Sequence, residues 1–306
     1  MKDILSQTWF KIQTRLFPFF ESEHEILTDK QRNLISILEL IPIEEYVPYR
    51  WWSRGRSTKD RSKLARAFVA KVVLNLPTTK DLIDYLFESR NLRVICGYES
   101  FNEIPSESTF SRSFNEFSEA GLPFRVHEEL IKKYESERLV GHITRDATDI
   151  VARETSIKKA KKVVIKRRPG RPSKGEIIPS KEKTRVEKQL NMSLEEMICE
   201  LPKDCDVGFK HKRGKPYFWK GYKFHVDWAD GEIPISCILT SASLNDSQAA
   251  IPLATMTSKR VQNLYDLMDS AYDSRLIREH SRKLGHVPII EHNRRKGKVK
   301  PEVPFI

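Results

Sequence analysis

Residues 264 to 273 read Leu264-Tyr-Asp-Leu-Met-Asp269-Ser-Ala-Tyr-Asp273, an apolar run that ends abruptly in a carboxylate, a small residue and an aromatic ring. A short apolar run is typical of a buried strand, and a helix signal follows at Ser274 through Leu276 and Ile277. The pattern predicts a strand that carries Asp269 at its C-terminal end. A single acid after a strand is more often a helix cap or a loop residue, so the role of Asp269 depends on the rest of the chain.

A second acid belongs to a predicted strand about 120 positions earlier. From Leu139 the apolar residues take up the period of a strand, which continues into Ile143-Thr-Arg-Asp146-Ala-Thr148. Asp146 therefore lies at the end of one predicted strand and Asp269 at the end of another.

The length and charge of the chain indicate which kind of partner it binds. The chain has 306 residues, enough for two domains with a real core, and a formal net charge of +12. Clustered Lys and Arg side chains release counterions from a phosphate backbone, so nucleic acid is the first candidate partner and a membrane surface the second. No apolar run approaches the roughly 20 residues that span a bilayer, and the N-terminus lacks a signal-peptide pattern. We expect a cytoplasmic protein with no membrane partner.

The N-terminal part is expected to be all-helical. We expect residues 1–56 to form a helical lead-in and residues 57–135 a helical DNA-binding domain, because apolar residues recur there at helical spacing. The groups are Leu64, Phe68 and Val72; Leu82 and Leu86; Phe110, Phe114 and Phe117 behind a capping Ser106; and Val126, Leu130 and Ile131. In a helix-turn-helix interpretation Ser108, Thr109 and Arg112 lie at the exposed start of a helix that enters a major groove. A helical packing or dimerisation domain explains the spacing equally well.

Residues 155–214 are expected to be a basic, flexible insertion, because they are highly charged and contain few apolar residues. Eight basic residues are concentrated at Lys158, Lys159, Lys161, Lys162, Lys166, Arg167, Arg168 and Arg171. If each neutralised one phosphate, the logarithm of DNA affinity would fall with the logarithm of salt concentration with a slope as steep as about −7. Further DNA contacts are expected from Lys212, Arg213, Arg294 and Arg295.

A hairpin and three further elements follow the insertion. Phe224, Val226 and Trp228 alternate with Lys223, His225 and Asp227, and the return strand carries Ile233, Ile235, Cys237 and Leu239. Asp230-Gly231 predicts a two-residue turn between these strands. Asn245 is expected to cap a helix through Met256, and Val287–Ile290 to be a last strand. From Leu139 the predicted order is strand, insertion, two hairpin strands, helix, strand, helix, strand.

This order describes an RNase H-like mixed α/β core. In such a sheet the first and fourth strands are neighbours, so Asp146 and Asp269 are expected to meet. Adjacent carboxylates repel one another, and a divalent cation between them keeps both ionised. Hard oxygen ligands favour Mg²⁺ or Mn²⁺, and two such ions support cleavage and transfer of phosphodiester strands.

Other polar residues have simpler interpretations. Asp246, Asp266 and Asp273 are expected to cap helices or to face solvent. His225 is expected to be a hydrogen-bonded strand histidine. Arg145 is expected on the face opposite to Asp146, in contact with DNA or an acidic neighbour.

Several segments together resemble a known family. In the predicted core they are Ile143-Thr-Arg-Asp146-Ala-Thr148, the Lys/Arg-rich insertion, Lys223-Phe-His225, Thr240-Ser-Ala-Ser-Leu-Asn-Asp246-Ser, Leu264 to Asp273, and His286-Val-Pro-Ile-Ile290. They resemble the DDE transposases of bacterial insertion sequences. Leu74-Asn-Leu-Pro-Thr-Thr79 and Ile104-Pro-Ser-Glu-Ser-Thr-Phe110 resemble the helical N-terminal domain of many of these proteins.

The resemblance implies cut-and-paste movement of DNA. It gives Asp146 and Asp269 the roles of first and second catalytic aspartate and of Mg²⁺ or Mn²⁺ ligands. It also implies binding of terminal inverted repeats in double-stranded DNA, action as a homodimer at the bacterial nucleoid, and no small-molecule substrate.

The family's third acidic ligand is a glutamate in a pattern that resembles Tyr-x-x-Arg-x-x-x-Glu-Arg, which the 306 residues do not contain. Glu291 directly follows a predicted strand, and Glu302 lies between Pro301 and Pro304, where a helix does not readily form. The core at residues 136–306 is therefore expected to be incomplete. We expect a DDE transposase, with two alternatives: a catalytically inactive DNA-binding fragment that acts as a repressor, and a cellular nuclease of the same fold.

Overall fold

The computed structural model describes residues 27–47, 59–156, 183–212 and 214–293. The chain divides into two units, Met1–Leu130 and Ile131–Ile306. The first unit is helical and the second is built on a mixed sheet with helices, which confirms the predicted fold class. In the described residues no helix has both the length and the apolar character to cross a membrane.

Short helices build the first unit. They are α2 (Asp29–Leu40), α3 (Arg61–Val73), α4 (Thr79–Glu88), α5 (Arg90–Cys96), α6 (Glu107–Glu119) and α7 (Leu122–Tyr134), the last of which continues into the second unit. Helices α2 to α5 each have a side-chain N-cap, whereas Ser106 stands at the N-cap of α6 without the expected capping hydrogen bond. Thr78 caps α4 in a reciprocal capping box with Asp81, so that the free N–H groups of the first turn are satisfied. Gly97, with φ of +90°, ends α5 in the left-handed conformation that favours glycine.

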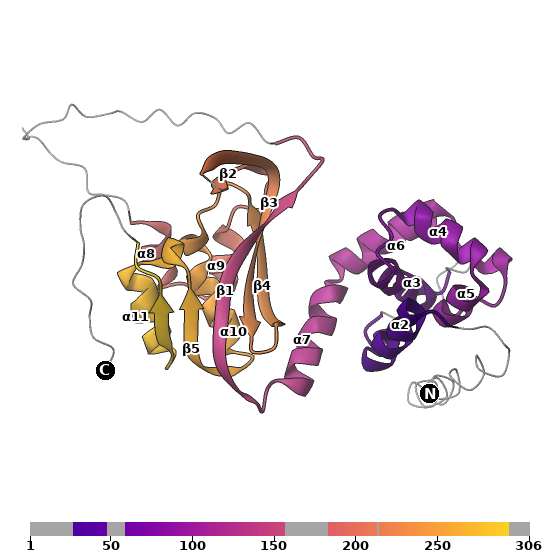
Figure 1. Ribbon diagram of the computed structural model, residues 1–306, viewed down its shortest axis with the longest axis horizontal. Coiled ribbons are helices and arrows are strands. Elements are labelled where there is room, and N and C mark those ends of the chain that lie inside the picture. Colours follow the sequence, from indigo (N-terminus) through magenta and orange to yellow (C-terminus); the bar gives the residue numbers. More distant parts are fainter. Residues whose placement is uncertain (1–26, 48–58, 157–182, 213, 294–306) are drawn as a thin grey trace, which may run out of the picture. The chain divides into compact units, whose positions relative to one another are not determined.

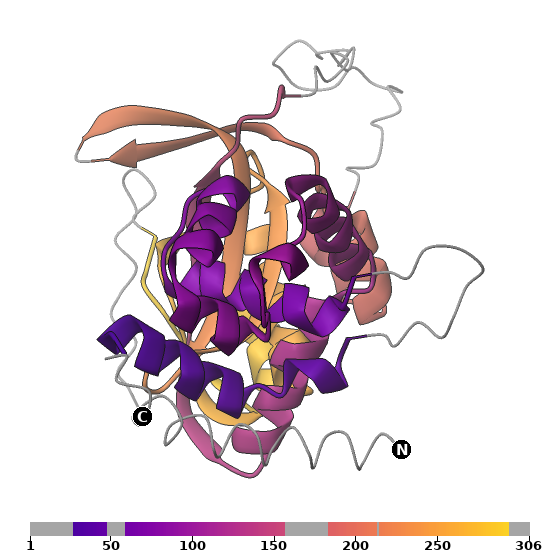
Figure 2. The same cartoon turned by 90° about the vertical axis from the view of Figure 1, so that its right-hand side faces the viewer.

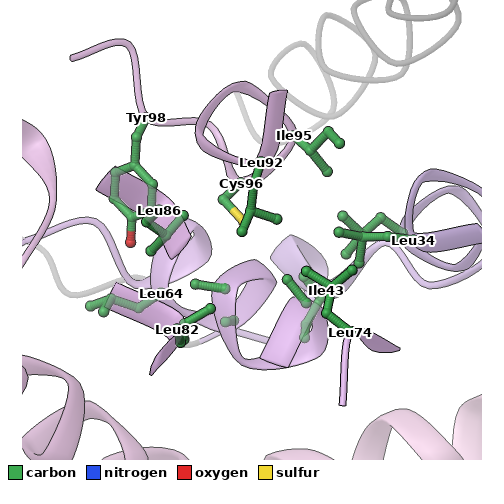
Figure 3. Packing of buried hydrophobic residues seen from close by; sticks show 14 of the residues in the cluster. Leu34, Ile43, Leu64, Leu74, Leu82, Leu86, Leu92, Ile95, Cys96 and Tyr98 are labelled. Carbon is green, nitrogen blue, oxygen red and sulfur yellow. The ribbon is translucent and has the colours of Figure 1, made fainter. Parts of the chain in front are cut away.

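Leucines from several helices form the core of this unit. Leu34, Leu64, Leu82 and Leu86 are completely buried in one cluster, in which Figure 3 shows Leu64, Leu82 and Leu86 near one another and Leu34 near Ile43. Two residues assigned to the apolar face by spacing are instead exposed, Val72 to 78% and Phe114 to 59%. For Val72 the reason is geometric: eight residues rotate an α-helix about 80° past two full turns, so Val72 leaves the stripe that begins at Leu64.

A six-stranded sheet organises the second unit (Figure 1). Its strands are β1 (Leu139–Val151), β2 (Asp206–Lys212), β3 (Lys215–Ala229), β4 (Ile233–Ser241), β5 (Gln262–Met268) and β6 (Val287–Ile290). The order is β2-β3-β1-β5-β6, with β4 paired to the far part of β3. β1 runs antiparallel to β3 and parallel to β5. The strand that contains Asp146 and the strand that precedes Asp269 are therefore neighbours, as predicted.

The two faces of the sheet differ. Helix α10 (Ala250–Ser258) contacts β3 and β4, and α11 (Arg275–Lys283) contacts β6. We call the side that these helices cover the helix face; it carries the buried residues Arg145, Lys223, His225, Asp227, Asp266 and Met268. We call the other side the open face; it carries the exposed residues Asp146, Trp228, Leu239, Tyr265, Val287 and Ile289.

Two local expectations need correction. The β3–β4 hairpin has three connecting residues rather than two, because Ala229 pairs with Ile233 and both Gly231 and Glu232 have positive φ. Part of the segment expected to be flexible is ordered: residues 183–212 contain α8 (Arg185–Gln189), α9 (Leu194–Glu200) and β2. Both short helices contact α10, and Met197 is buried there.

Candidate active site

Asp146 and Asp269 lie next to one another on neighbouring strands. Asp269 directly follows β5, whereas Asp146 lies within β1, which continues to Val151 rather than ending at Asp146 as expected. Arg145 on β1 pairs with Met268 on β5, so the next residue of each strand is a candidate carboxylate. Asp146 Oδ1 accepts a hydrogen bond from the N–H of Ala147 at 2.7 Å. Asp269 Oδ1 accepts one from the N–H of Ala271 at 3.0 Å and so caps the short helix η4 (Ser270–Tyr272). Both carboxylates are solvent-exposed, and the sheet brings together the two acids that the sequence singles out.

Negative charge accumulates around Asp269. Partial burial raises the pKa of its carboxyl group, and the negative charges of Asp146, Asp246 and Glu291 raise it further, while the hydrogen bond from Ala271 opposes the shift. Glu291 is held at this place because its N–H donates to the carbonyl of Met268 at 3.1 Å. Ionisation of the Asp269 carboxyl group is therefore disfavoured by its surroundings, and a bound cation would remove that penalty.

Asp246 faces a buried cation rather than solvent. Lys223 Nζ lies 2.9 Å from Asp246 Oδ1 and donates to the carbonyl of Leu244 at 2.8 Å. His225 Nδ1 is 3.9 Å from the same carboxylate oxygen, and its Nε2 is 2.9 Å from Thr240 Oγ1. Burial, aided by the charge of Lys223, lowers the pKa of His225 to about 4, although Asp246 opposes this shift. His225 is thus the hydrogen-bonded strand histidine that was expected.

A network of buried charges lies beneath the candidate acids. Arg145 donates from Nε and Nη2 to the two oxygens of Asp227 at 2.8 and 2.7 Å, and Thr257 donates to Asp227 at 2.6 Å. Asp266 accepts a hydrogen bond from Asn263 Nδ2 at 2.9 Å and lies 3.4 Å from His286 Nδ1.

These contacts settle two expectations. Arg145 contacts an acidic neighbour on the helix face, the second of the two alternatives. The expectation that Asp266 caps a helix or faces solvent is wrong, because Asp266 is 1% exposed. Although burial acts against it, the contact with His286 and the charge of Arg145 lower the pKa of Asp266 to about 2.

Asp273 fastens the segment after β6 to the loop that carries Asp269. Its Oδ1 accepts a hydrogen bond from Arg278 Nη2 at 3.0 Å, and its Oδ2 accepts one from the N–H of Asn293 at 3.0 Å. The side chain is 15% exposed, so it is neither a simple cap nor a solvated residue. Asn293 Nδ2 in turn donates to the carbonyl of Ser270 at 3.3 Å. The sequence shows an acid at position 273, but it does not reveal this role, because an acid just before a helix is usually its cap.

A cavity of about 850 Å³ adjoins this loop. Residues from after β4, after β5 and after β6 line it together with His211 of β2, and they include Asn245, Ser270, Asp273 and Asn293. A second cavity of about 390 Å³ lies between the β2–β3 pair and the loop after β4, with Asp149, Lys223 and Asp246 among its lining residues. Both cavities therefore lie beside the region of the clustered acids.

The residues proposed for DNA contact are spread over both units. Ser108 and Arg112 are exposed in the first turns of α6, and Thr109 between them is half-buried. Lys212 ends β2. The other basic candidates lie outside the residues that the structure describes: Lys158, Lys159, Lys161, Lys162, Lys166, Arg167, Arg168, Arg171, Arg213, Arg294 and Arg295.

The carboxylates suit a hard divalent cation, since both supply oxygen ligands on adjacent strands and the pKa of Asp269 is raised by neighbouring negative charge. Within residues 27–47, 59–156, 183–212 and 214–293, however, no three His, Cys, Asp or Glu side chains stand close enough together to hold one ion. Among the described residues, Asp146 and Asp269 are therefore a pair of neighbouring carboxylates without a third ligand side chain beside them.

Two protein families match the sequence. The family described as Transposase domain (DUF772) matches residues 21–116, and the family described as Transposase DDE domain matches residues 143–303. The second match covers more than half of the 306 residues and includes both Asp146 and Asp269. No curated protein and no solved structure matches the chain.

Proposed function

This chain belongs to the DDE transposases of the insertion-sequence type, and from that premise we propose that it cleaves and joins DNA with Asp146 and Asp269 as metal ligands. The family carries out DNA transposition and generally uses divalent metals. The observation that carries the proposal is the pairing of β1 with β5, whose last pair is Arg145 with Met268, so that the next residues along the chain, Asp146 and Asp269, are neighbours.

Asp146 and Asp269 would hold Mg²⁺ or Mn²⁺. When bound, such ions activate a water or a 3′-hydroxyl and stabilise the leaving oxygen in phosphodiester chemistry. The protein's contribution is to hold the carboxylates in place: a backbone N–H fixes one oxygen of each, and the hydrogen bonds of Asp273 tie down the loop beside Asp269. Lys223 neutralises Asp246 nearby, which limits the repulsion that Asp269 experiences.

DNA recognition is assigned to two regions. The exposed start of α6, with Ser108, Thr109 and Arg112, is proposed to read the terminal inverted repeats of double-stranded DNA. The basic segment around Lys158 to Arg171 is proposed to follow the phosphate backbone. We propose that the chain acts on DNA as a homodimer and takes no small-molecule substrate.

A second candidate function follows if the ligand set of this chain is limited to the two aspartates proposed above. Because the described residues contain no group of three ligand side chains, a catalytically inactive chain that binds element ends and represses intact copies is the alternative. The two candidates differ in a single property, which is whether bound DNA is cut.

The test is a strand-transfer assay with the purified chain, DNA that carries the element's inverted repeat, and Mg²⁺. Asp146→Asn and Asp269→Asn are expected to reduce cleavage about a hundredfold or more, because each removes a metal ligand. Glu195→Gln, an exposed acid on α9, is the control and should retain full activity. Salt-sensitive binding of the repeat with no cleavage by the unaltered chain would reject the enzyme and favour the repressor.

A further inference from the structure

The β2–β3 ribbon is a feature that the proposed chemistry does not use. It comprises β2 and the first part of β3, and it projects beyond the rest of the sheet (Figures 1 and 2). Its register pairs Phe209 with Phe218 and Gly208 with Trp219. Since paired residues share a face, the ribbon has one side with the two phenylalanines and another with the tryptophan.

One side of the ribbon packs inward. Trp219 is 4% exposed, its ring stacks on that of Tyr217, and its indole N–H donates to the carbonyl of Tyr222 at 3.1 Å. Gly208 allows this arrangement, because a Cβ at that position would lie only 2.4 Å from the Trp219 ring. The buried Trp219 therefore fixes which side of the ribbon packs inward, and the side with Phe209 and Phe218 faces outward as a result.

The outward side exposes two aromatic rings. Phe209 is 51% and Phe218 64% exposed, and their ring centroids are 4.9 Å apart. Val207 beside them is also exposed, and Lys220 is exposed on the same side of β3. A solvent-exposed pair of large rings marks a binding surface, and the positive charge of Lys220 beside it favours an anionic partner.

This surface continues to the candidate acids. Every second residue of β3 from Phe218 lies on the same side, through Lys220, Tyr222 and Phe224 to Val226, which pairs with Asp146. At the other strand of the ribbon, His211 contacts Phe209 edge-on at 5.0 Å between centroids and lines the cavity beside Ser270. A strand of DNA at the acids would therefore meet aromatic and basic side chains in succession along β3.

We propose that the β2–β3 ribbon binds single-stranded DNA next to the candidate active site, with bases stacked on Phe209 and Phe218 and phosphates near Lys220. This inference rests on the proposed function, because DNA cleavage produces strand ends whose bases can leave the duplex. Stacking requires an unpaired base, and any base can stack, so the ribbon would act without reading sequence.

The test measures binding of a short fluorescent oligothymidylate and of a blunt duplex to the full chain. Phe209→Ala and Phe218→Ala are each expected to weaken binding of the single strand about tenfold, with a much smaller effect on the duplex. Phe218→Tyr keeps an aromatic ring and should restore affinity. Phe124→Ala on α7 is the matched control, because Phe124 is 63% exposed, and it should change nothing.

Three results would overturn the proposal: unchanged affinity in both alanine variants, an equal loss for the single strand and the duplex, or dissociation of an oligomer by Phe218→Ala in light scattering. The last would make the ribbon an interface between copies of the chain. Asp269→Asn separates this proposal from the proposed function. It should abolish cleavage and leave oligothymidylate affinity intact, so either idea can fail while the other stands.

Discussion

Arg145 and Asp146 are neighbours in sequence and face opposite sides of the sheet. Arg145 is 2% exposed and forms a two-pronged ion pair with Asp227, which is completely buried. The pair joins β1 to β3 directly beneath the candidate acid. A buried ion pair of this kind is costly to break, because the remaining partner keeps its charge without compensation.

We expect Arg145→Met to lower the free energy of unfolding by about 3 to 5 kcal/mol, measured by urea denaturation. The control is Arg275→Gln, because Arg275 forms an exposed ion pair with Glu279 on α11 and its loss should change stability little. The double variant Arg145→Met/Asp227→Leu should recover part of the loss, since no unpaired charge remains. Equal effects of the two single variants would contradict the assignment.

His225 makes the stability of the second unit depend on pH. Its pKa is about 4 in the folded chain, against about 6.5 in an unfolded chain, because it is buried and lies near Lys223. The unfolded state therefore binds more protons between these values. The stabilisation is complete above pH 6.5 and is lost as the pH falls, by about 3 kcal/mol at pH 4.

The measurement is the free energy of unfolding at pH 7 and pH 4 for the wild type and for His225→Gln. The variant lacks the titrating ring, so its loss of stability on acidification should be smaller by about 3 kcal/mol. Asp246 and Thr240, which face the ring, are unchanged in both proteins. Parallel pH profiles would show that His225 does not titrate as described.

At the scale of elements, the close approach of β3 to β1 requires one glycine. Gly221 has φ of +151°, and a Cβ there would lie 2.0 Å from the carbonyl oxygen of Ile150 on β1. Gly221 pairs with Val151 on one side and with Asp206 on the other, so it marks the point where β3 leaves β1 and enters the ribbon.

Gly221→Ala is expected to destabilise the second unit by more than Gly285→Ala. At Gly285 φ is +90° and no atom lies within 4 Å of the added Cβ, so that variant reports backbone strain alone, on the order of 1 to 2 kcal/mol. The difference between the two losses of stability measures the steric clash of the added Cβ with β1. Thermal unfolding monitored by circular dichroism gives both values, and equal losses would show that β1 moves away at no cost.

Much of the core could be predicted because strand periodicity and turn residues are local signals. The strand around Asp146, the hairpin and the strand before Asp269 follow from such signals, whereas the neighbouring position of the two acids follows from the strand order of an RNase H-like sheet. The ribbon was harder, because β2 lies in a highly charged segment that resembles a disordered insertion.

The orientation of the sheet could not be predicted from alternation. Phe224 and Trp228 alternate with Lys223, His225 and Asp227, and hydropathy alone favours the apolar set as the buried one. The helices instead cover the polar set, whose partners Arg145, Thr240 and Thr257 come from other elements distant in sequence. Alternation defines two faces, and only tertiary contacts decide which one is covered.

At the scale of the whole molecule, the net charge of +12 predicts salt-sensitive DNA binding. If the eight basic residues between Lys158 and Arg171 are replaced by glutamine, we expect the slope of log affinity against log salt to become shallower by up to about 7. Fluorescence anisotropy over a range of salt concentrations measures the slope. A variant with the same residues 158–171 in scrambled order keeps the charge and should keep the slope. A shallower slope in this scrambled variant would show that specific contacts matter, and not charge alone.

The pairing of β1 with β5 also has a consequence for folding kinetics. Arg145 and Met268 touch although 123 residues separate them, whereas the helical unit is built from contacts between helices close in sequence. Closing so long a loop carries an entropic cost that must be met before the pairing stabilises the chain, so parallel pairing of this kind is slow. On refolding, far-UV helical signal should therefore return before Asp146 and Asp269 come together. During synthesis Asp146 leaves the ribosome well before its partner strand exists, and the newly made chain passes through an interval in which it has its N-terminal helices and no assembled acid pair.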